Sequence, residues 1–255
     1  MSLYNWPEYY DIAFSRDLTS DLNFFISCFK KYGPVKKVLE PACGTGVWLI
    51  ELAKRGYYVV GYDINHHMVK YAKRRIIEEG LEAEVLLGDM RYMKFKEKFD
   101  AAIIPINSLG YCLSDDDILN HFQSMAFSLN GIYIVEISCA CEDIRKEKKP
   151  DEFWISKRGN IIVECLWRPY SYDFNKRLKY IEFKMKVKEG EKCLLYFEEE
   201  HKLRLWIYEE FKDLVERGGF QIAEIYDQNY NPVSKEEKIT GELGSLYYIL
   251  TKKGY

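Results

Sequence analysis

The sequence predicts an α/β protein with a mostly parallel sheet, helices on both of its faces and an antiparallel β insertion late in the chain. Short apolar runs alternate with amphipathic runs through the first half, which is typical of parallel strands joined by helices. Residues 181–188 instead alternate apolar and charged side chains with a period of two, which is typical of a half-buried antiparallel strand. Hydrophobic residues make up 47% of the 255 residues, so the chain can bury a core.

The strands expected in the first half are short, apolar and followed by residues that favour turns. We expect them at residues 36–40, 57–62, 83–87, 99–104 and 132–137. Helices are expected at residues 47–53, between Asn65 and Gly80, and at residues 115–129. Asn65 can cap the second of these helices, and Ser114 with the acidic run after it can start the third.

The regular alternation ends after the fifth strand. Residues 139–160 are charged and are interpreted as a loop, whereas residues 157–205 are interpreted as antiparallel strands with a turn at Glu189-Gly190. A helix near residues 207–218 and strands at residues 220–226 and 246–251 complete the sheet. We therefore expect an N-terminal helical cap (1–34), a body (35–138 and 206–255) and an inserted antiparallel β subdomain above the body (139–205).

Composition and charge argue against several function classes. The formal net charge is -3, so a nucleic acid is not expected as the main partner. The first residues lack a basic region followed by an apolar run, and the longest uncharged stretch, residues 118–135, contains several polar side chains, so neither a signal peptide nor a membrane helix is expected. The 7 cysteines are scattered, which favours free thiols in the cytoplasm. Cys139-x-Cys141 lacks further ligands at suitable spacing, so no metal is expected.

The residues that follow the first three strands point to a nucleoside-binding site. Ligands of an open parallel sheet bind outside the carboxyl ends of its strands. Gly44 and Gly46 follow the first strand, where glycine lets the backbone turn tightly and approach a ligand. Asp63 ends the second strand and can accept both hydroxyls of a ribose, and Asp89 after the third can meet the exocyclic amine of adenine. The three features together predict a pocket for an adenosine-bearing cofactor.

These segments resemble the class I S-adenosylmethionine-dependent methyltransferases, specifically the small-molecule type. Residues 38–46, Val-Leu-Glu-Pro-Ala-Cys-Gly-Thr-Gly, are similar to the acidic-x-x-x-Gly-x-Gly signature of that family. Matching segments follow at residues 60–65, 88–90, 99–104, 203–206 and 218–220. The resemblance covers residues 35–251 apart from the insertion, and it implies a Rossmann-like, seven-stranded sheet whose last strand is antiparallel.

The resemblance also implies S-adenosylmethionine as the cofactor and assigns roles to residues of this chain. Gly44 and Gly46 would let the loop pass under the methionine part, and Glu40 would orient that loop. Asp63 would hold the ribose. Arg16 could bind the methionine carboxylate, or it could be a solvated side chain. The complete set of expected cofactor-binding residues is Tyr9, Glu40, Ala42, Gly44, Gly46, Asp63, Ile64, Met68, Asp89, Met90 and Asn107.

Two other functions remain open at this point. A nicotinamide-dependent oxidoreductase also needs Gly-x-Gly and an acid after the second strand, but its fingerprint continues to a third glycine, and Leu49 occupies that position here. A non-catalytic S-adenosylmethionine-binding protein would have the same pocket and could use the insertion to contact a partner. Turnover with an acceptor distinguishes an enzyme from such a binder.

The acceptor is expected to be a small molecule. Methyltransferases that act on nucleic acid bases often carry Asn/Asp-Pro-Pro-aromatic after the fourth strand, where this chain has Pro105-Ile106-Asn107. The aromatic residues of the insertion, Trp167 among them, are expected to cover the acceptor, or else to form a core of their own. The protein is expected to be a monomer or a homodimer.

Methyl transfer needs alignment of the acceptor and exclusion of water more than it needs a metal. A general base helps only an acceptor that arrives protonated, and His201 is the candidate, unless it is simply solvated. Tyr111 and Arg204 are the candidate acceptor-binding residues. Because Arg204 lies three positions after His201 in a strand, the two side chains are expected on opposite faces.

Overall fold

The computed structural model describes residues 2–140, 150–234, 239 and 243–253. Its main sheet runs in the order β11-β12-β5-β4-β1-β2-β3, and the short β10 pairs with β5 beside that path. The strands are β1 (Lys37–Pro41), β2 (Tyr58–Asp63), β3 (Ala83–Leu87), β4 (Phe99–Ile104), β5 (Leu129–Ala140), β10 (Trp206–Ile207), β11 (Phe220–Tyr226) and β12 (Ser245–Lys252). Strands β1 to β5 are parallel, and β12 is antiparallel to both β5 and β11. The predicted α/β, Rossmann-like sheet is confirmed.

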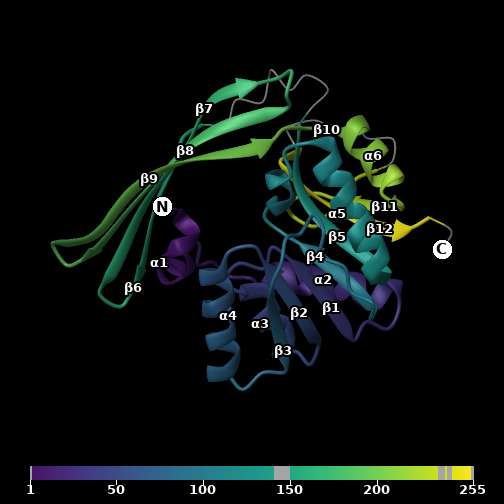
Figure 1. Ribbon diagram of the computed structural model, residues 1–255, viewed down its shortest axis with the longest axis horizontal. Coiled ribbons are helices and arrows are strands. Elements are labelled where there is room, and N and C mark those ends of the chain that lie inside the picture. The colour runs from purple at the N-terminus through teal and green to yellow at the C-terminus, as the bar shows by residue number, and fades with distance from the viewer. Residues whose placement is uncertain (1, 141–149, 235–238, 240–242, 254–255) are drawn as a thin grey trace.

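Helices cover both faces of this sheet (Figure 1). They are α1 (Pro7–Ala13), α2 (Thr19–Tyr32), α3 (Val47–Ala53), α4 (His66–Glu78), α5 (Asp115–Ser128) and α6 (Tyr208–Arg217), with short 3-10 helices η1 (Leu3–Asn5) and η2 (Ser108–Tyr111). One apolar cluster joins the sheet to α5 and α6, and another joins it to α2, α3 and α4. The members of both clusters are at most 7% exposed, so burial of apolar surface on the two faces fixes the position of the strand ends.

Two predicted helix caps form as the sequence indicates. The Oδ1 atom of Asn65 accepts hydrogen bonds from the backbone N–H groups of His67 and Met68, at 2.9 and 3.2 Å. The hydroxyl of Ser114 accepts from the N–H of Asp117 at 3.1 Å. These bonds satisfy donors that the first turn of a helix leaves without an intrahelical partner.

The late part of the chain forms a separate four-stranded antiparallel sheet in the order β6-β7-β8-β9. Its strands are β6 (Glu152–Arg158), β7 (Ile161–Asp173), β8 (Leu178–Glu189) and β9 (Lys192–Arg204). Within the described residues, the loop expected at 139–160 is wrong for residues 152–158, because β6 is an edge strand whose mostly polar, exposed side chains hide its period-two pattern. Strands β5 and β8 extend further than the predicted residues 132–137 and 181–188.

The N-terminal elements lie between the two sheets. Figure 1 shows α1 next to β6 and close to α4. Leu3, Ile12 and Ala13 pack against the buried face of the four-stranded sheet, which includes Phe183 and Met185. The division of the chain into cap, body and inserted subdomain stays a prediction, and residues 141–149, which the last of these includes, lie outside the described residues.

Candidate functional site

A cavity of about 940 Å³ opens at the carboxyl ends of the parallel strands. Its walls come from the loops after β1, β2 and β4, from the N-terminal segment and from the four-stranded sheet. Eight of the predicted site residues line it: Glu40, Ala42, Gly44, Asp63, Ile64, Met90, Asn107 and Tyr111. The remaining predicted residues are not among its lining: Tyr9, Gly46, Met68, Asp89, His201 and Arg204.

The two glycines after β1 have different roles. Gly44 has a φ of +53°, and a Cβ built on it would meet nothing within 4 Å, so this backbone faces the open cavity. Gly46 has a φ of +75° and caps α3, and a Cβ there would lie 3.2 Å from the Cβ of Ala72 in α4. Both conformations favour glycine. Gly44 therefore leaves room for a ligand, whereas Gly46 lets α3 pack closely on α4.

The carboxylate of Asp63 is held by two backbone N–H groups and can still accept further hydrogen bonds. Its Oδ2 atom accepts from the N–H of Gly44 at 2.9 Å, and its Oδ1 atom accepts from the N–H of Asn65 at 2.8 Å. Burial raises the pKa of this carboxyl, and the two N–H donors oppose that shift. Each carboxylate oxygen can accept a further hydrogen bond. The geometry thus suits a pair of hydroxyl groups held against the glycine loop.

Glu40 is buried at the end of β1, with an exposed fraction of 2%. The N–H of Leu49 donates to its carboxyl, but Oε2 has no hydrogen-bond partner among the residues that the structure describes. Burial raises the pKa of Glu40 well above its usual range. An unpartnered buried carboxyl oxygen is costly unless a donor or a cation meets it. Glu40 therefore fits a cofactor that brings positive charge to this side of the loop.

The third predicted acid, Asp89, is occupied by a neighbouring side chain. Arg91 donates to it through Nε at 3.0 Å and through Nη2 at 2.6 Å, and it also pairs with Asp117 at 3.2 Å. Arg91 holds the pKa of Asp89 below its usual value. The neighbouring Met90 lines the cavity, and Met68 is fully buried in the core.

The loop after β4 carries backbone strain. Ile106 and Asn107 have φ values of 51° and 54°, and residues other than glycine adopt such values at a cost of about 1–3 kcal/mol each. The N–H of Ile106 donates to buried Glu136 at 2.6 Å, and Trp206 Nε1 donates to Asn107 Oδ1 at 3.2 Å. These contacts hold both residues on the cavity wall. Strain of this kind gathers at functional sites, and the sequence gives no local signal of it.

The N-terminal segment contributes residues that only the tertiary structure brings to the site. Tyr10 lines the cavity, whereas Tyr9 stacks on Trp6 and lies outside the lining. Arg16 also lines the cavity, with its guanidinium 3.1 Å from Asp21 and 5.6 Å from the centre of the Trp48 ring. Arg16 is thus placed where it could meet an anionic group of a ligand.

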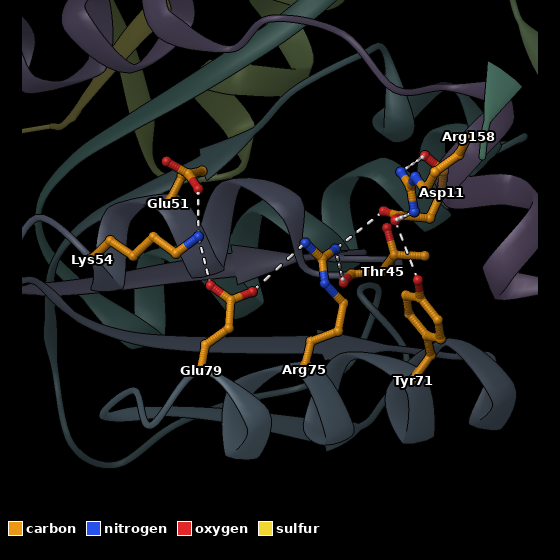
Figure 2. A network of polar contacts seen from close by, with 8 residues as sticks. All are labelled: Asp11, Thr45, Glu51, Lys54, Tyr71, Arg75, Glu79 and Arg158. Atoms are coloured by element: carbon orange, nitrogen blue, oxygen red, sulfur yellow. Dashed lines mark hydrogen bonds and ion pairs between the residues drawn. The ribbon is translucent and has the colours of Figure 1, made fainter. Parts of the chain in front are cut away.

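Asp11 of α1 connects three other parts of the chain (Figure 2). Its carboxylate lies 3.1 Å from Arg75 of α4 and 2.8 Å from Arg158 of β6, and it accepts from the hydroxyl of Tyr71 at 3.2 Å. The same Nη1 atom of Arg75 also donates to the carbonyl of Thr45 in the glycine loop, at 3.4 Å. A single buried carboxylate therefore ties the N-terminal helix to the four-stranded sheet and, through Arg75, to the loop.

A chain of polar side chains runs from the cavity into the four-stranded sheet. The hydroxyl of Tyr4 donates to the hydroxyl of Tyr111 at 2.6 Å, and the latter lies 3.0 Å from Nδ1 of His201. On the far side of the imidazole, Nε2 lies 3.0 Å from Oε1 of Glu199, outside ideal hydrogen-bond alignment. Tyr111 and His201 are among the residues predicted from the sequence, whereas Tyr4 and Glu199 are not. The spacing of Glu199 and His201, which puts both on one strand face, could have revealed the latter.

Arg204 lies on the opposite side of β9, as its spacing from His201 predicts. It forms an ion pair with Asp115 and lies over the ring of Trp206 at 5.3 Å. Among the described residues, no group of three or more His, Cys, Asp or Glu side chains is placed to hold a metal ion; Cys141, part of the motif considered above, lies outside them. No described helix is long and apolar enough to span a membrane.

Comparisons with known proteins agree with this geometry. Residues 38–130 match the family model described as "Methyltransferase domain". The putative methyltransferase YqeM of Bacillus subtilis (strain 168) is 28% identical over 193 residues, which cover 74% of this chain and 75% of the relative.

Two solved structures share the fold over nearly the whole chain. An S-adenosylmethionine-dependent methyltransferase from Clostridium acetobutylicum superposes with a TM-score of 0.79 at 20% identity, covering 99% of this chain and 100% of that one. CalS10, an amino pentose methyltransferase from Micromonospora echinaspora, superposes with a TM-score of 0.74 at 16% identity, covering 99% and 98%. The domain match at residues 38–130 and the shared fold agree with the resemblance drawn from the sequence: this part of the chain matches a methyltransferase domain, and the whole chain has the fold of solved S-adenosylmethionine-dependent methyltransferases.

Proposed function

We propose that the protein transfers a methyl group from S-adenosylmethionine to a small-molecule acceptor that enters the cavity beneath the four-stranded sheet. The observation that carries this proposal is the composition of the cavity walls. One side consists of the glycine loop with Glu40 and Asp63, and the other consists of aromatic side chains from the N-terminal segment and the four-stranded sheet. Its volume of about 940 Å³ lies near the top of the range of roughly 300–1,000 Å³ for small-molecule pockets.

The cofactor half of the cavity is assigned from the contacts above. Asp63 would accept hydrogen bonds from the ribose hydroxyls, the open backbone at Gly44 would leave space for the amino acid part, and Glu40 would meet its positive charge. Arg16 would meet its carboxylate. Ile64, Met90 and Asn107 complete this wall of the cavity. Asp89 would act at the adenine edge only through its neighbours, because Arg91 occupies its carboxylate.

The chain itself supplies alignment and shielding from water. When bound, S-adenosylmethionine offers a methyl group on a positively charged sulfur, which an acceptor lone pair displaces in line. Phe14, Trp154 and Trp167 line the acceptor half with apolar surface. Their rings would exclude water and hold the acceptor in one orientation, which is the main requirement for a displacement between two bound partners. The amino pentose substrate named for CalS10 supports a small acceptor for this shared fold.

Binding of S-adenosylhomocysteine, measured by titration calorimetry, tests the cofactor half. We expect Asp63→Ala to weaken it about 5- to 150-fold, since roughly 1–3 kcal/mol of charge-assisted hydrogen bonding is lost. Asp116→Ala, which removes an exposed acid from the start of α5, is the control and should bind like the wild type. Unchanged affinity in Asp63→Ala would remove the ribose assignment, and binding of NADH in place of S-adenosylhomocysteine would support an oxidoreductase instead.

Release of S-adenosylhomocysteine in the presence of acceptors tests the reaction. A suitable panel contains glycine and nucleotide sugars that carry either an amino or a hydroxyl group at one position. Methylation of at least one member supports the enzyme. Tight binding of the cofactor with no methylation of any member favours the non-catalytic binder.

A further inference from the structure

We propose that the methyl acceptor is an amine and that Tyr111, His201 and Glu199 form a relay that takes the proton from it. This inference rests on the proposed function. It adds a substrate class and a route for the proton that alignment and shielding alone do not supply.

The hydrogen-bond directions in the relay agree with each other. Because the Tyr111 hydroxyl accepts from Tyr4 at 2.6 Å, its own hydrogen is free to point at Nδ1 of His201, 3.0 Å away. An imidazole that accepts at Nδ1 carries its hydrogen on Nε2. That nitrogen lies 3.0 Å from Glu199 Oε1. Tyr111 and His201 are therefore oriented to pass a proton away from the cavity, and Glu199 lies close enough to the imidazole to balance its charge.

The burial of the three residues makes Tyr111 the entry to the relay. Tyr111 lines the cavity with an exposed fraction of 37%, whereas the His201 side chain is only 4% exposed. His201 stacks on the ring of Trp167, with ring centres 5.2 Å apart. Burial raises the pKa of Tyr111 to about 12, so its phenol stays protonated at neutral pH and transmits a proton without holding a negative charge.

The surroundings of His201 can balance the charge that it gains. The N–H of Leu3 donates to Glu199 at 2.7 Å. Burial alone would raise the pKa of Glu199, but the contacts with His201 and Leu3 hold it below its usual value, so the carboxylate remains ionised. The titratable groups that face the imidazole are Glu199 on its own strand, Tyr4 of η1 and Tyr111 of η2. Trp167 of β7 and Phe183 of β8 complete the contacts and do not titrate.

The cavity walls favour a cationic acceptor. The rings of Tyr4, Tyr10, Phe14, Trp154 and Trp167 all line the cavity. Aromatic faces attract ammonium groups by about 0.5–2 kcal/mol, depending on how fully water is excluded. An ammonium nitrogen has no lone pair with which to attack, so it must first lose a proton. A phenol–imidazole relay can accept that proton, and the aromatic walls favour an ammonium over a neutral hydroxyl group.

The proposed step balances as follows. The ammonium nitrogen gives a proton to the Tyr111 oxygen while the Tyr111 hydroxyl proton moves to Nδ1 of His201, which leaves an imidazolium beside Glu199. The nitrogen lone pair freed in this way forms the bond to the methyl carbon. The carbon–sulfur bond breaks with its electron pair left on sulfur. The proton on His201 later returns to solvent.

The closing experiment compares Tyr111→Phe with Tyr196→Phe, which removes a hydroxyl from an exposed tyrosine of the same four-stranded sheet. The acceptor is a nucleotide sugar with an amino group, and the counterpart with a hydroxyl group at the same position serves as the alternative. We expect methylation of the amine only, and a loss of about 10²–10⁴ in kcat for Tyr111→Phe at pH 7 with little change in KM. The deficit should shrink as the pH approaches values at which the amine is itself unprotonated. Tyr196→Phe should behave like the wild type.

Preferential methylation of the hydroxy sugar would overturn the proposal, and so would a Tyr111→Phe deficit that is the same at every pH, since that pattern indicates a structural role. Glu199→Gln should reproduce the pH-dependent loss. The affinity for S-adenosylhomocysteine checks that each variant is folded.

Nitrogen NMR of the imidazoles separates failure of the relay from failure of the proposed function, because it needs neither cofactor nor acceptor. The chain has 4 histidines, so the signals of His201 are those lost in His201→Asn. We expect the Nε2–H tautomer and a shift of Nδ1 in Tyr111→Phe. A Nδ1–H tautomer, or no response to Tyr111→Phe, would refute the relay even in an active enzyme.

Discussion

Asp11→Asn is the substitution that tests most directly how the N-terminal segment is held over the cavity. The change keeps the size of the side chain but replaces an ionised oxygen with an amide group that faces two arginines. Asp11 is 7% exposed, and its carboxylate accepts hydrogen bonds from the side chains of Arg75, Arg158 and Tyr71 at 3.1, 2.8 and 3.2 Å. We expect the variant to fold and to lose stability.

The magnitude follows from the exposure of the partners. Removing one member of a fully buried ion pair costs about 3–5 kcal/mol. Here the side chains of Arg75 and Arg158 are 23% and 50% exposed, so they recover part of their hydration when the charge of Asp11 is lost. We therefore expect the free energy of unfolding to fall by about 2–3 kcal/mol. For a chain of this size, that corresponds to a decrease in Tm of about 4–12 °C.

Urea denaturation of the wild type, Asp11→Asn, Arg158→Gln and the double variant measures this coupling. We expect a coupling energy of about 1–2 kcal/mol between the two sites, because both single variants break the same pair. Glu8→Gln is the matched control on the same helix. Its ion pair with Arg74, at 3.5 Å, is exposed, so a change below about 0.5 kcal/mol in the free energy of unfolding is expected. A stability of Asp11→Asn equal to that of Glu8→Gln, or strict additivity in the cycle, would refute the reasoning.

Two further predictions concern buried titratable groups. Burial raises the pKa of Glu40, so the stability that its protonated form provides is complete below the ordinary glutamate pKa and is lost as the pH rises through the pKa of the folded protein. Glu40→Gln should therefore raise the Tm of the cofactor-free protein at pH 8 but not at pH 4. The same variant should bind S-adenosylhomocysteine more weakly in calorimetry. Burial lowers the pKa of His121 to about 4 from an ordinary value of 6.5, so its contribution to the free energy of unfolding, about 3 kcal/mol, is present above pH 6.5 and is lost as the pH falls toward 4. Urea denaturation across that range should show a smaller acid loss in His121→Gln, and parallel pH profiles would contradict this assignment.

The meeting of the glycine loop and Asp63 at the cavity could be predicted from the sequence because its signals are local. Gly44 directly follows a buried strand, and Asp63 ends the next strand, so a parallel sheet is sufficient to bring the two together. The observed hydrogen bond between the Gly44 N–H and Asp63, at 2.9 Å, is the consequence. The caps at Asn65 and Ser114 were predictable for the same reason, since each involves residues within one helical turn.

The opposite wall of the cavity, formed by the N-terminal segment and the four-stranded sheet, could not be predicted in this way, because its contacts join residues that are far apart in the chain. Tyr4 meets Tyr111, and Asp11 meets Arg158, only after two sheets and the N-terminal helix have packed together. The interpretation of Asp89 was incomplete because a carboxylate at a strand end can bind a ligand or a nearby arginine, and the sequence does not show the direction of Arg91. Strand β6 was not predicted because an edge strand need not bury one full face, so its sequence shows no clear alternation of apolar and polar residues.

The N-terminal segment makes the two halves of the cavity parts of one structure. Arg75 contacts both Asp11 and the carbonyl of Thr45, so the glycine loop and α1 share a partner. A few residues earlier, the N–H of Leu3 holds Glu199, and Tyr4 holds Tyr111. A ligand that stabilises the glycine loop should therefore also stabilise the N-terminal segment that contacts the proposed relay. By linkage, a ligand bound at the relay should increase the affinity for the first ligand by the same factor. Residues 3–11 thus contact both the partner of the glycine loop and the residues of the proposed relay, although none of them belongs to the Gly-x-Gly motif.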